Sequence, residues 1–407
     1  MGKVKMEKLQ ATKMTNQALK LVKEIVGRYK GRLSGSKECL DAAEDLAVEF
    51  EKVTDKVVRE KFTLSEQAFL AWIKILVVIY PIALLLSFFS LPITALILLL
   101  AGLFIMVGQF FLYKEVIDRF FPKVDALNVF GIIEPKKEVL NTVVFSGHHD
   151  SARVFNFFVD KPHLYIFKVG GALASYGALT LLTLVQIFVK LFNQNYSIKP
   201  FLPFQIILTV AIYLMAKLWF FASDEATPGA GDNLIASAMA VEVARYFKNR
   251  EKPLEHTRLI VASFDGEEAG LRGARHFYKN NKELFEGSLY NFNVDCPYFA
   301  KDLFFLTSDI NGSVKLSQQM ATQCVDIAKG MGYEAFSQPI AFLTGGTDAA
   351  EAAKVGFEAV SLMAMPWDNK SRANVYHTPN DLPEAIEVEA VKRALSIAIR
   401  FIEQVDE

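Results

Sequence analysis

Cysteine is scarce in this sequence. Cys39, Cys296 and Cys324 are the three cysteines in 407 residues and lie far apart, which excludes a disulfide framework as the basis of the fold. The first residues are charged and contain no apolar run, so we expect no cleaved signal peptide. An excess of one charge is missing too, because 44 Lys and Arg residues stand against 45 Asp and Glu residues. The charge balance therefore gives no indication of nucleic-acid binding.

Long apolar stretches are what the sequence has in abundance. Hydrophobic residues make up 52% of the chain. A helix needs roughly 20 apolar residues to cross a bilayer, and four stretches approach or reach this length: 75–90, 91–112, 169–189 and 201–221. The alternative is that they are core helices of a large soluble protein. Their number and their low charge favour membrane spans.

The spans are arranged in two pairs, so we expect two helical hairpins, at 67–115 and 163–222. Each hairpin returns the chain to its starting side, which leaves 1–66, 116–162 and 223–407 together on one side of the membrane. The hairpin tips carry Lys190 and Lys199. The basic residues that flank the spans on the other side are Lys56, Arg59, Lys61, Lys74, Lys114, Arg119, Lys123, Lys161 and Lys168. The excess of basic residues predicts that this side is cytoplasmic.

Outside the spans, apolar strand patterns alternate with helical ones. We expect strands at 57–64, 128–133, 142–146, 258–264, 288–295, 303–306 and 358–363. We expect helices at 11–29, 37–50, 233–247, 271–278, 313–331 and 382–404. This alternation predicts an α/β fold, with a mainly parallel mixed sheet flanked by helices and four transmembrane helices inserted as two hairpins.

Histidines and carboxylates stand at the ends of these predicted elements. His148, Asp232, Glu268 and Asp295 each lie at or just beyond the end of a strand or at the start of a helix, where open α/β sheets place their ligand sites. Zinc binds imidazole nitrogen and carboxylate oxygen, and a pair of ions needs a bridging carboxylate with further ligands on each side. With His377 added, these residues form a candidate ligand set for two zinc ions.

Two further acids have positions that suit supporting roles. Glu267 adjoins a candidate ligand, and because consecutive side chains point in different directions, its carboxylate could face the attacking water. Asp150 lies two residues after His148 on an extended chain, where it could hydrogen-bond the imidazole. Taken one at a time, such acids have simpler explanations, for instance as helix N-terminal residues. The prediction of a catalytic metal site therefore depends on all these positions taken together.

The motifs around these residues resemble those of a known family. Gly147-His-His-Asp-Ser, Gly229-Ala-Gly-Asp-Asn, Phe264-Asp-Gly-Glu-Glu-Ala-Gly, Asn293-Val-Asp and Val375-Tyr-His-Thr-Pro resemble the five ligand motifs of the M28 zinc peptidases, in the family's order. Arg32-Leu-Ser-Gly-Ser and Gly346-Thr-Asp resemble two further segments of that family.

The resemblance implies a role for each matching residue. The match to Asp232 bridges two zinc ions. The matches to His148 and Asp295 are the further ligands of one ion, and the matches to Glu268 and His377 are the further ligands of the other.

The remaining matches imply the catalytic groups. The match to Glu267 is the general base that takes a proton from the attacking water, and the match to Asp150 supports the His148 ligand. The family also implies a cis peptide bond between Asp232 and Asn233. The expected enzyme is a membrane-embedded aminopeptidase with peptides as substrates and the lipid bilayer as its surroundings.

Two alternatives remain at this point. A glutaminyl-cyclase-like acyltransferase has a similar ligand set with a single zinc ion. A receptor or scaffold on the same fold would have no catalysis. Thr347 and Ala349 depart from the family's common residues beside the substrate pocket, so the sequence leaves substrate preference open.

Overall fold

The computed structural model describes residues 2–193 and 196–407, and the described chain divides into two compact units. We call them the α/β unit and the helical unit. The α/β unit consists of Met1–Glu66, Lys123–Val154 and Asp224–Glu407, and the helical unit of Gln67–Pro122 and Phe155–Ser223. The domain boundaries that we drew from the sequence stay a prediction.

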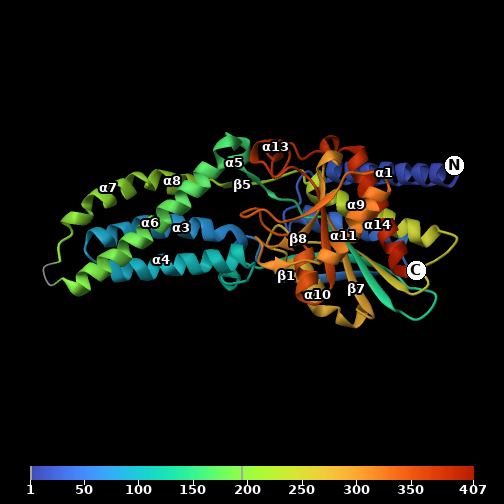
Figure 1. The fold of residues 1–407 in the computed structure, drawn as a ribbon, viewed down its shortest axis with the longest axis horizontal. Helices are drawn as coiled ribbons and strands as arrows, with labels where there is room; N and C mark the ends of the chain where they lie inside the picture. Colours follow the sequence, from blue (N-terminus) through green and yellow to red (C-terminus); the bar gives the residue numbers. More distant parts are fainter. Residues whose placement is uncertain (1, 194–195) are drawn as a thin grey trace. The chain divides into compact units, whose positions relative to one another are not determined.

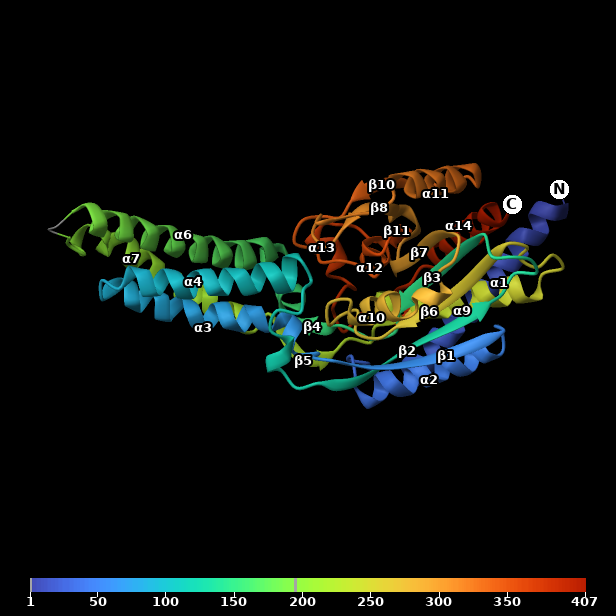
Figure 2. The ribbon, with the colours of Figure 1, turned by 90° about the horizontal axis from the view of Figure 1, so that it is seen from below.

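A mixed sheet forms the centre of the α/β unit (Figures 1 and 2). The strands of this sheet are β1 (Lys56–Leu64), β2 (Val124–Ile133), β3 (Asn141–His148), β6 (Thr257–Phe264), β7 (Ser288–Pro297), β8 (Leu303–Asp309), β9 (Val314–Lys315), β10 (Phe336–Pro339) and β11 (Glu358–Ala364). Their order is β1-β2-β6-β3-β7-β11-β8-β10, with β9 paired to β8. The four central strands β6, β3, β7 and β11 run parallel. The predicted fold class is confirmed.

Helices cover both faces of this sheet (Figure 2). They are α1 (Gly2–Arg28), α2 (Lys37–Glu51), α9 (Ile235–Asn249), α10 (Arg272–Asn280), α11 (Gln318–Gly330), α12 (Ala349–Lys354), α13 (Asn369–Arg372) and α14 (Val388–Asp406). The layer that contains α9 and α14 packs on β3 and β7, and α10 and α12 pack on the opposite side. Because both faces are covered, β3 is a continuous apolar run in which Val143, Val144 and Phe145 are fully buried.

Several predicted boundaries needed correction. The helix predicted at 313–331 begins only at Gln318, because β9 pairs with β8 first and the Ser317 side chain caps the helix by accepting from the Met320 backbone N–H. The helix predicted at 382–404 begins at Val388, after a 3-10 turn at Pro383–Ala385. The strand β10 was not predicted. It is a four-residue strand at the sheet edge, too short to show an apolar alternation.

The helical unit consists of long apolar helices. They are α3 (Ala68–Phe88), α4 (Pro92–Met106, extended by a π-helical turn at Val107–Phe111), α6 (Tyr165–Phe192), α7 (Leu202–Val210) and α8 (Ile212–Leu218), with a short α5 (Asn156–Val159). Within the described residues, four helical segments are long and apolar enough to cross a membrane: Ala68–Phe88, Pro92–Phe111, Pro162–Phe192 and Lys199–Leu218. They overlap the four predicted spans, although the last is interrupted at Ala211 between α7 and α8.

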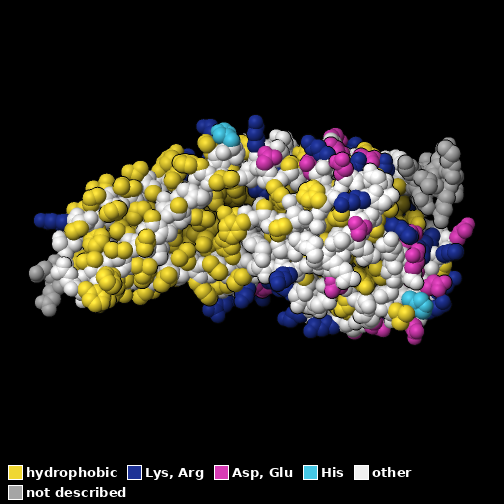
Figure 3. Space-filling model, viewed as in Figure 1, with side chains coloured by type: hydrophobic (Ala, Val, Ile, Leu, Met, Phe, Trp, Pro, Cys, Tyr) yellow, Lys and Arg dark blue, Asp and Glu magenta, His cyan; other side chains and the backbone are white. Residues whose placement is uncertain are grey.

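The outer surface of the helical unit is apolar (Figure 3). Ile97, Phe104 and Val210 are 63%, 68% and 74% exposed. Soluble proteins rarely expose a contiguous apolar surface of this extent. Such a surface suits contact with lipid.

Two short strands complete the described elements. The strands β4 (Arg153–Phe155) and β5 (Ala222–Ala226) pair with each other in a sheet of their own. The sequence did not predict them, because three to five residues are too few for a period to be read.

Candidate metal centre

The three central strands bring distant ligands to one edge of the sheet. His148 is the last residue of β3, Asp295 lies near the end of β7, and Glu267 and Glu268 follow β6. These strands are neighbours and run parallel, so their carboxyl ends meet at the same edge. The proximity of these side chains therefore follows from the strand order.

The other two candidate ligands come from irregular segments. Asp232 precedes α9, with a non-helical backbone (φ −119°, ψ 82°), and the peptide bond to Asn233 is cis, as the family resemblance implies. His377 follows α13 and has a positive φ of 52°. These backbone conformations aim both side chains at the strand ends. The helix predicted at 233–247 accordingly begins two residues later.

The potential ligand atoms form overlapping groups: two of them share Asp232, and a third consists of His148, Glu267 and Glu268. Among the described residues, His148, Asp232 and Asp295 form one group, and Asp232, Glu268 and His377 another. In each group the potential ligand atoms all lie within 4.8 Å of one another. Asp232 directs Oδ1 toward His148 Nε2 at 3.5 Å and Oδ2 toward His377 Nε2 at 3.2 Å. One carboxylate thus faces two imidazoles with its two oxygens.

These separations match those between ligands of one metal ion. Ligands about 2.1 Å from a tetrahedral zinc lie about 3.4 Å apart. The two Asp232 contacts have this length, and so does the 3.5 Å separation of His377 Nε2 from Glu268 Oε1. They are longer than ordinary charge-assisted hydrogen bonds of roughly 2.7–2.9 Å. The residues present therefore fit a pair of zinc ions.

The electrostatics of the site also favour bound cations. Burial raises the pKa of Glu267 and of Glu268 well above the usual glutamate value, and further carboxylates nearby add to the effect. Burial and the charge of Asp232 raise the pKa of Asp295 to about 6. Burial lowers the pKa of His148, but the charge of Glu267 and the pairs with Asp150 and Asp232 together outweigh it, so that this pKa lies well above its usual value of 6.5. The site concentrates negative charge, which divalent cations would neutralise.

Asp150 links the first imidazole to the two glutamates. Its Oδ1 lies 3.3 Å from His148 Nδ1. Its carboxylate also accepts from the backbone N–H of Glu267 and of Glu268, at 3.3 and 3.0 Å, and from the Ser34 hydroxyl at 2.8 Å. A single buried carboxylate thereby orients the His148 ring and the turn that carries both glutamates.

Arg32 holds the loop before Asp232 and was given no individual role from the sequence. Its side chain is fully buried and donates to the carbonyl oxygens of His149, Pro228 and Gly229 at 2.8, 2.9 and 2.7 Å. Gly229 has a φ of +60°, and a Cβ there would lie 2.5 Å from Ser151. The glycine and the arginine together set the path of the chain into the site.

Asp381 is a second residue that sequence reasoning missed. It accepts from the backbone N–H of Gly231 at 2.7 Å and of Asp232 at 3.2 Å. Burial and the charge of Asp232 raise its pKa to about 7. The available signal was its position, four residues after His377, but a lone Asp after Asn indicates a turn more readily than a site.

Asp348 is a third such residue. Its side chain is 1% exposed, and neither carboxylate oxygen makes a hydrogen bond to any residue that the structure describes. The preceding Thr347 donates its backbone N–H and its hydroxyl to Asp309 at 2.9 and 2.6 Å, which fixes this loop. Burial raises the pKa of Asp348 well above its usual value, while the charge of His148 lowers it and the charge of Asp295 raises it. Asp348 therefore lies close enough to the candidate ligands to interact with their charges.

A comparison with known protein families finds a match that includes most of the candidate ligands. Residues 216–402 match the sequence model of peptidase family M28. The match contains four of the five motifs, those around Asp232, Glu268, Asp295 and His377, and confirms the resemblance.

Solved structures of similar fold include exopeptidases and cyclases. The LapA aminopeptidase of Legionella pneumophila is 12% identical, with 99% of this chain and 75% of that chain covered at a TM-score of 0.56. A Zn-dependent exopeptidase from Parabacteroides distasonis is 13% identical, with coverages of 95% and 97% and a TM-score of 0.57. The glutaminyl cyclase of Fimbriiglobus ruber is 14% identical, with coverages of 96% and 94% and a TM-score of 0.55.

At identities of 12%, 13% and 14%, the similarity shows only that the chain shares this fold. No curated protein sequence gives a significant match to the chain.

Proposed function

We propose that this chain is a membrane-embedded, zinc-dependent metallopeptidase that acts as an aminopeptidase. The observation that carries the proposal is the position of Asp232, whose two carboxylate oxygens face two different imidazoles at ligand-to-ligand distances. The family match over residues 216–402 supports peptidase chemistry. The fold that the chain shares with an aminopeptidase and a Zn-dependent exopeptidase supports it further.

In this proposal, two zinc ions are held by residues of the α/β unit. His148 and Asp295 would hold one ion, Glu268 and His377 the other, and Asp232 would bridge them. Bound zinc would lower the pKa of water toward roughly 7 and polarise the scissile carbonyl group.

Glu267 is the proposed general base. Its Oε2 lies 3.7 Å from His148 Nε2, and although Glu267 also forms a potential group with His148 and Glu268, the two groups that share Asp232 are complete without it. It would accept a proton from the attacking water and pass it to the leaving amine. Asp150 would act on the reaction by orienting His148, because it touches that ring and the turn that carries Glu267.

The helical unit would place the enzyme in a bilayer. The four apolar helices support a multi-pass protein with the catalytic unit on the cytoplasmic side. Protease protection in sealed vesicles tests the orientation. Cleavage of the α/β unit from the outside of right-side-out vesicles would reject the proposed orientation and leave the chemistry untouched.

The catalytic proposal is tested by metal analysis combined with peptide digestion. We expect the purified chain to hold two zinc ions and to release single N-terminal residues from a peptide library near neutral pH. Acetylated peptides of the same sequences are the matched control and should not be cut. Chelation should abolish the activity and zinc should restore it. A folded chain with both ions that cleaves no peptide in the library would reject the aminopeptidase assignment.

A second candidate is glutaminyl-cyclase-like acyl transfer with one zinc ion. It is favoured by the fold similarity to a glutaminyl cyclase. Peptides with N-terminal glutamine separate the two candidates. Loss of ammonia with an intact chain length indicates the cyclase, whereas release of free glutamine indicates the aminopeptidase. A chain that binds no zinc and does neither would be a non-catalytic scaffold.

A further inference from the structure

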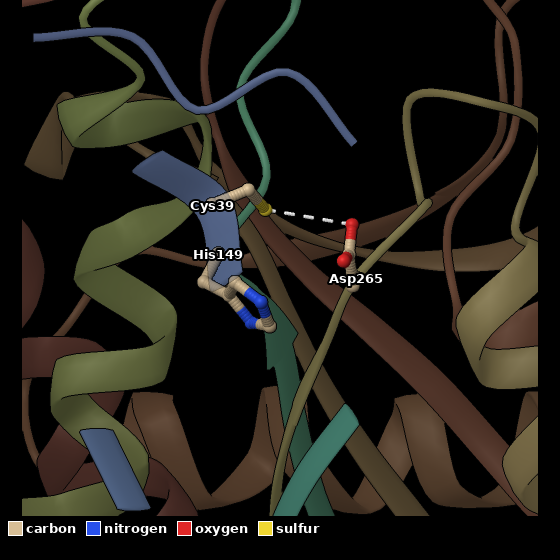
Figure 4. A group of neighbouring side chains, drawn as sticks. All are labelled: Cys39, His149 and Asp265. Carbon is tan, nitrogen blue, oxygen red and sulfur yellow. Dashed lines mark hydrogen bonds between the residues drawn. The ribbon is translucent and has the colours of Figure 1, made fainter. Parts of the chain in front are cut away.

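A second set of metal-type donors lies in the α/β unit, outside the ligand set described above. Cys39, His149 and Asp265 bring a thiol, an imidazole and a carboxylate around one space (Figure 4). Cys39 lies in the first turn of α2, His149 follows β3 and Asp265 follows β6. One potential ligand atom from each lies within 4.8 Å of the other two. All three side chains are fully buried.

The thiol and the carboxylate already have a ligand-to-ligand separation. Cys39 Sγ lies 3.4 Å from Asp265 Oδ1, and Figure 4 shows the thiol pointing at this carboxylate. A zinc–sulfur bond of about 2.3 Å and a zinc–oxygen bond of about 2.1 Å at a tetrahedral angle place the two atoms about 3.5 Å apart. An ion can therefore contact both atoms with little change in their positions.

His149 supplies the observation that points to a ligand. Its Nδ1 pairs with the Ser263 hydroxyl at 2.8 Å, and that hydroxyl in turn contacts the Ser237 hydroxyl at 2.6 Å. Nε2 is buried and makes no hydrogen bond to any residue within 2–193 or 196–407. A metal-binding histidine commonly has one nitrogen held by a polar partner, which leaves the other for the ion. A buried unpaired nitrogen is costly, and a metal bond would remove that cost.

The charges around the cluster permit a divalent cation. Asp265 Oδ2 is held by the Leu127 backbone N–H at 3.1 Å, as outer hydrogen bonds hold many metal-binding carboxylates. A thiolate and a carboxylate carry two negative charges together, which one divalent ion neutralises. Burial and the charges of Asp265 and Asp150 raise the pKa of the Cys39 thiol well above its usual value, and Arg32 lowers it, so a cation bound at this place would stabilise the thiolate.

We infer that Cys39, His149 and Asp265 form a zinc site with three protein ligands, separate from the proposed catalytic pair. The mixture of thiolate, imidazole and carboxylate donors favours zinc over magnesium or calcium, which prefer oxygen ligands. Binding releases the thiol proton to solvent as the sulfur–zinc bond forms. The ion would tie the start of α2 to the ends of β3 and β6, next to the residues that carry His148 and Glu267. The inference does not require the proposed peptidase activity.

Cobalt substitution tests the site directly, because a cysteine thiolate bound to Co²⁺ absorbs in the near ultraviolet whereas imidazole and carboxylate ligands do not. We expect the full-length chain, purified in detergent and loaded with Co²⁺, to show this charge-transfer band. The Cys39→Ala variant should lose it. Cys296→Ala and Cys324→Ala are matched controls, because both cysteines are buried and free, and both variants should keep the band. A wild-type chain that binds Co²⁺ without the band overturns the inference, as does a band that survives in Cys39→Ala.

X-ray absorption of the zinc-loaded wild type gives a second measurement that needs no variant to fold. We expect a sulfur shell at about 2.3 Å from zinc. The double variant His148→Ala/His377→Ala removes one ligand from each ion of the proposed catalytic pair, so these two ions should be lost. The sulfur shell should then become stronger relative to the nitrogen and oxygen shell. Zinc with only nitrogen and oxygen neighbours would reject the site while leaving the proposed function intact. A sulfur shell in a chain without peptidase activity would support the zinc site and count against the proposed function.

Discussion

The candidate metal centre of the α/β unit and the interior between α3, α6 and α7 of the helical unit differ in the polar groups that they bury. In the α/β unit, seven carboxyl groups and two histidines lie at the candidate metal centre: Asp150, Asp232, Glu267, Glu268, Asp295, Asp348 and Asp381, with His148 and His377. In the helical unit, a buried polar group consists of neutral side chains: Ser87 donates to Gln186 at 2.9 Å and accepts from Gln205 at 2.8 Å. Amides and hydroxyls cost less to bury than ions do.

The outer surfaces of the two units also differ in how many charged side chains they carry. Charged side chains are scattered over the visible face of the α/β unit, whereas apolar side chains cover most of that of the helical unit (Figure 3). A unit that faces water can gather charge at one internal site and keep its surface solvated. A unit that faces lipid must satisfy its polar groups internally with neutral partners. Four changes test this contrast.

The largest effect is expected from Glu267→Gln, which removes the proposed base and retains the shape of the side chain. Turnover of a cleavable peptide should fall by about 10²–10⁴-fold, with zinc content unchanged by metal analysis. Glu283→Gln, at an exposed position of the same unit, is the matched control and should retain activity. Normal turnover in Glu267→Gln would remove the base assignment.

Arg32→Met probes the buried charge that organises the α/β unit. The carbonyl oxygens of His149, Pro228 and Gly229 would lose their donor, at a cost of about 3 kcal/mol or more in the free energy of unfolding. Denaturant unfolding followed by tryptophan fluorescence or circular dichroism measures the loss. Arg28→Met removes an exposed pair with Asp45 and should change stability by about 0.5 kcal/mol or less. Equal losses in the two variants would contradict the role of Arg32.

Leu100→Arg places a charge on the exposed face near the middle of the α4 span. If this face contacts lipid, insertion should become less favourable by about 3 kcal/mol, seen as a lower inserted fraction in a microsomal glycosylation assay. Val355→Arg puts the same charge on an exposed apolar position at the end of α12 and should be nearly neutral in an unfolding measurement. A Leu100→Arg chain that inserts as well as wild type would indicate that this surface faces water.

The smallest effect is expected from Gln186→Leu, which breaks the neutral polar group of the helical unit. Hydrogen bonds between membrane helices contribute about 0.6 kcal/mol on average and up to about 1.7 kcal/mol. Unfolding in mixed micelles should reveal a loss of this size. Thr180→Val is the control, because the Thr180 hydroxyl bonds to the Tyr176 carbonyl within its own helix. A loss in Gln186→Leu as large as that in Arg32→Met would erase the contrast between the units.

The family comparison and the geometry show which site residues could be predicted. His148, Glu268 and Asp295 could be found because each follows an apolar strand, and parallel strands end at one edge of a sheet. Asp232 and His377 needed the family motifs, because their positions depend on irregular backbone that no periodicity predicts.

Other residues had no local signal at all. Asp381 acts by accepting two backbone N–H groups from the Asp232 segment, about 150 residues earlier in the chain. Arg32 and the segment at 228–229 are almost 200 residues apart. Such contacts depend on how separate segments converge, which composition and spacing do not contain.

By itself, the sequence determined the residue types of the candidate ligands, the alternation of strands and helices, and four apolar stretches of membrane-spanning length, because each of these is a local or periodic property of the chain. The tertiary structure alone decided that the two oxygens of Asp232 face different imidazoles and that Asp150 supports both the ring and the glutamates. It also decided that Cys39 meets His149 and Asp265. Those distances arise from strand order and loop packing, which join residues that the sequence holds far apart.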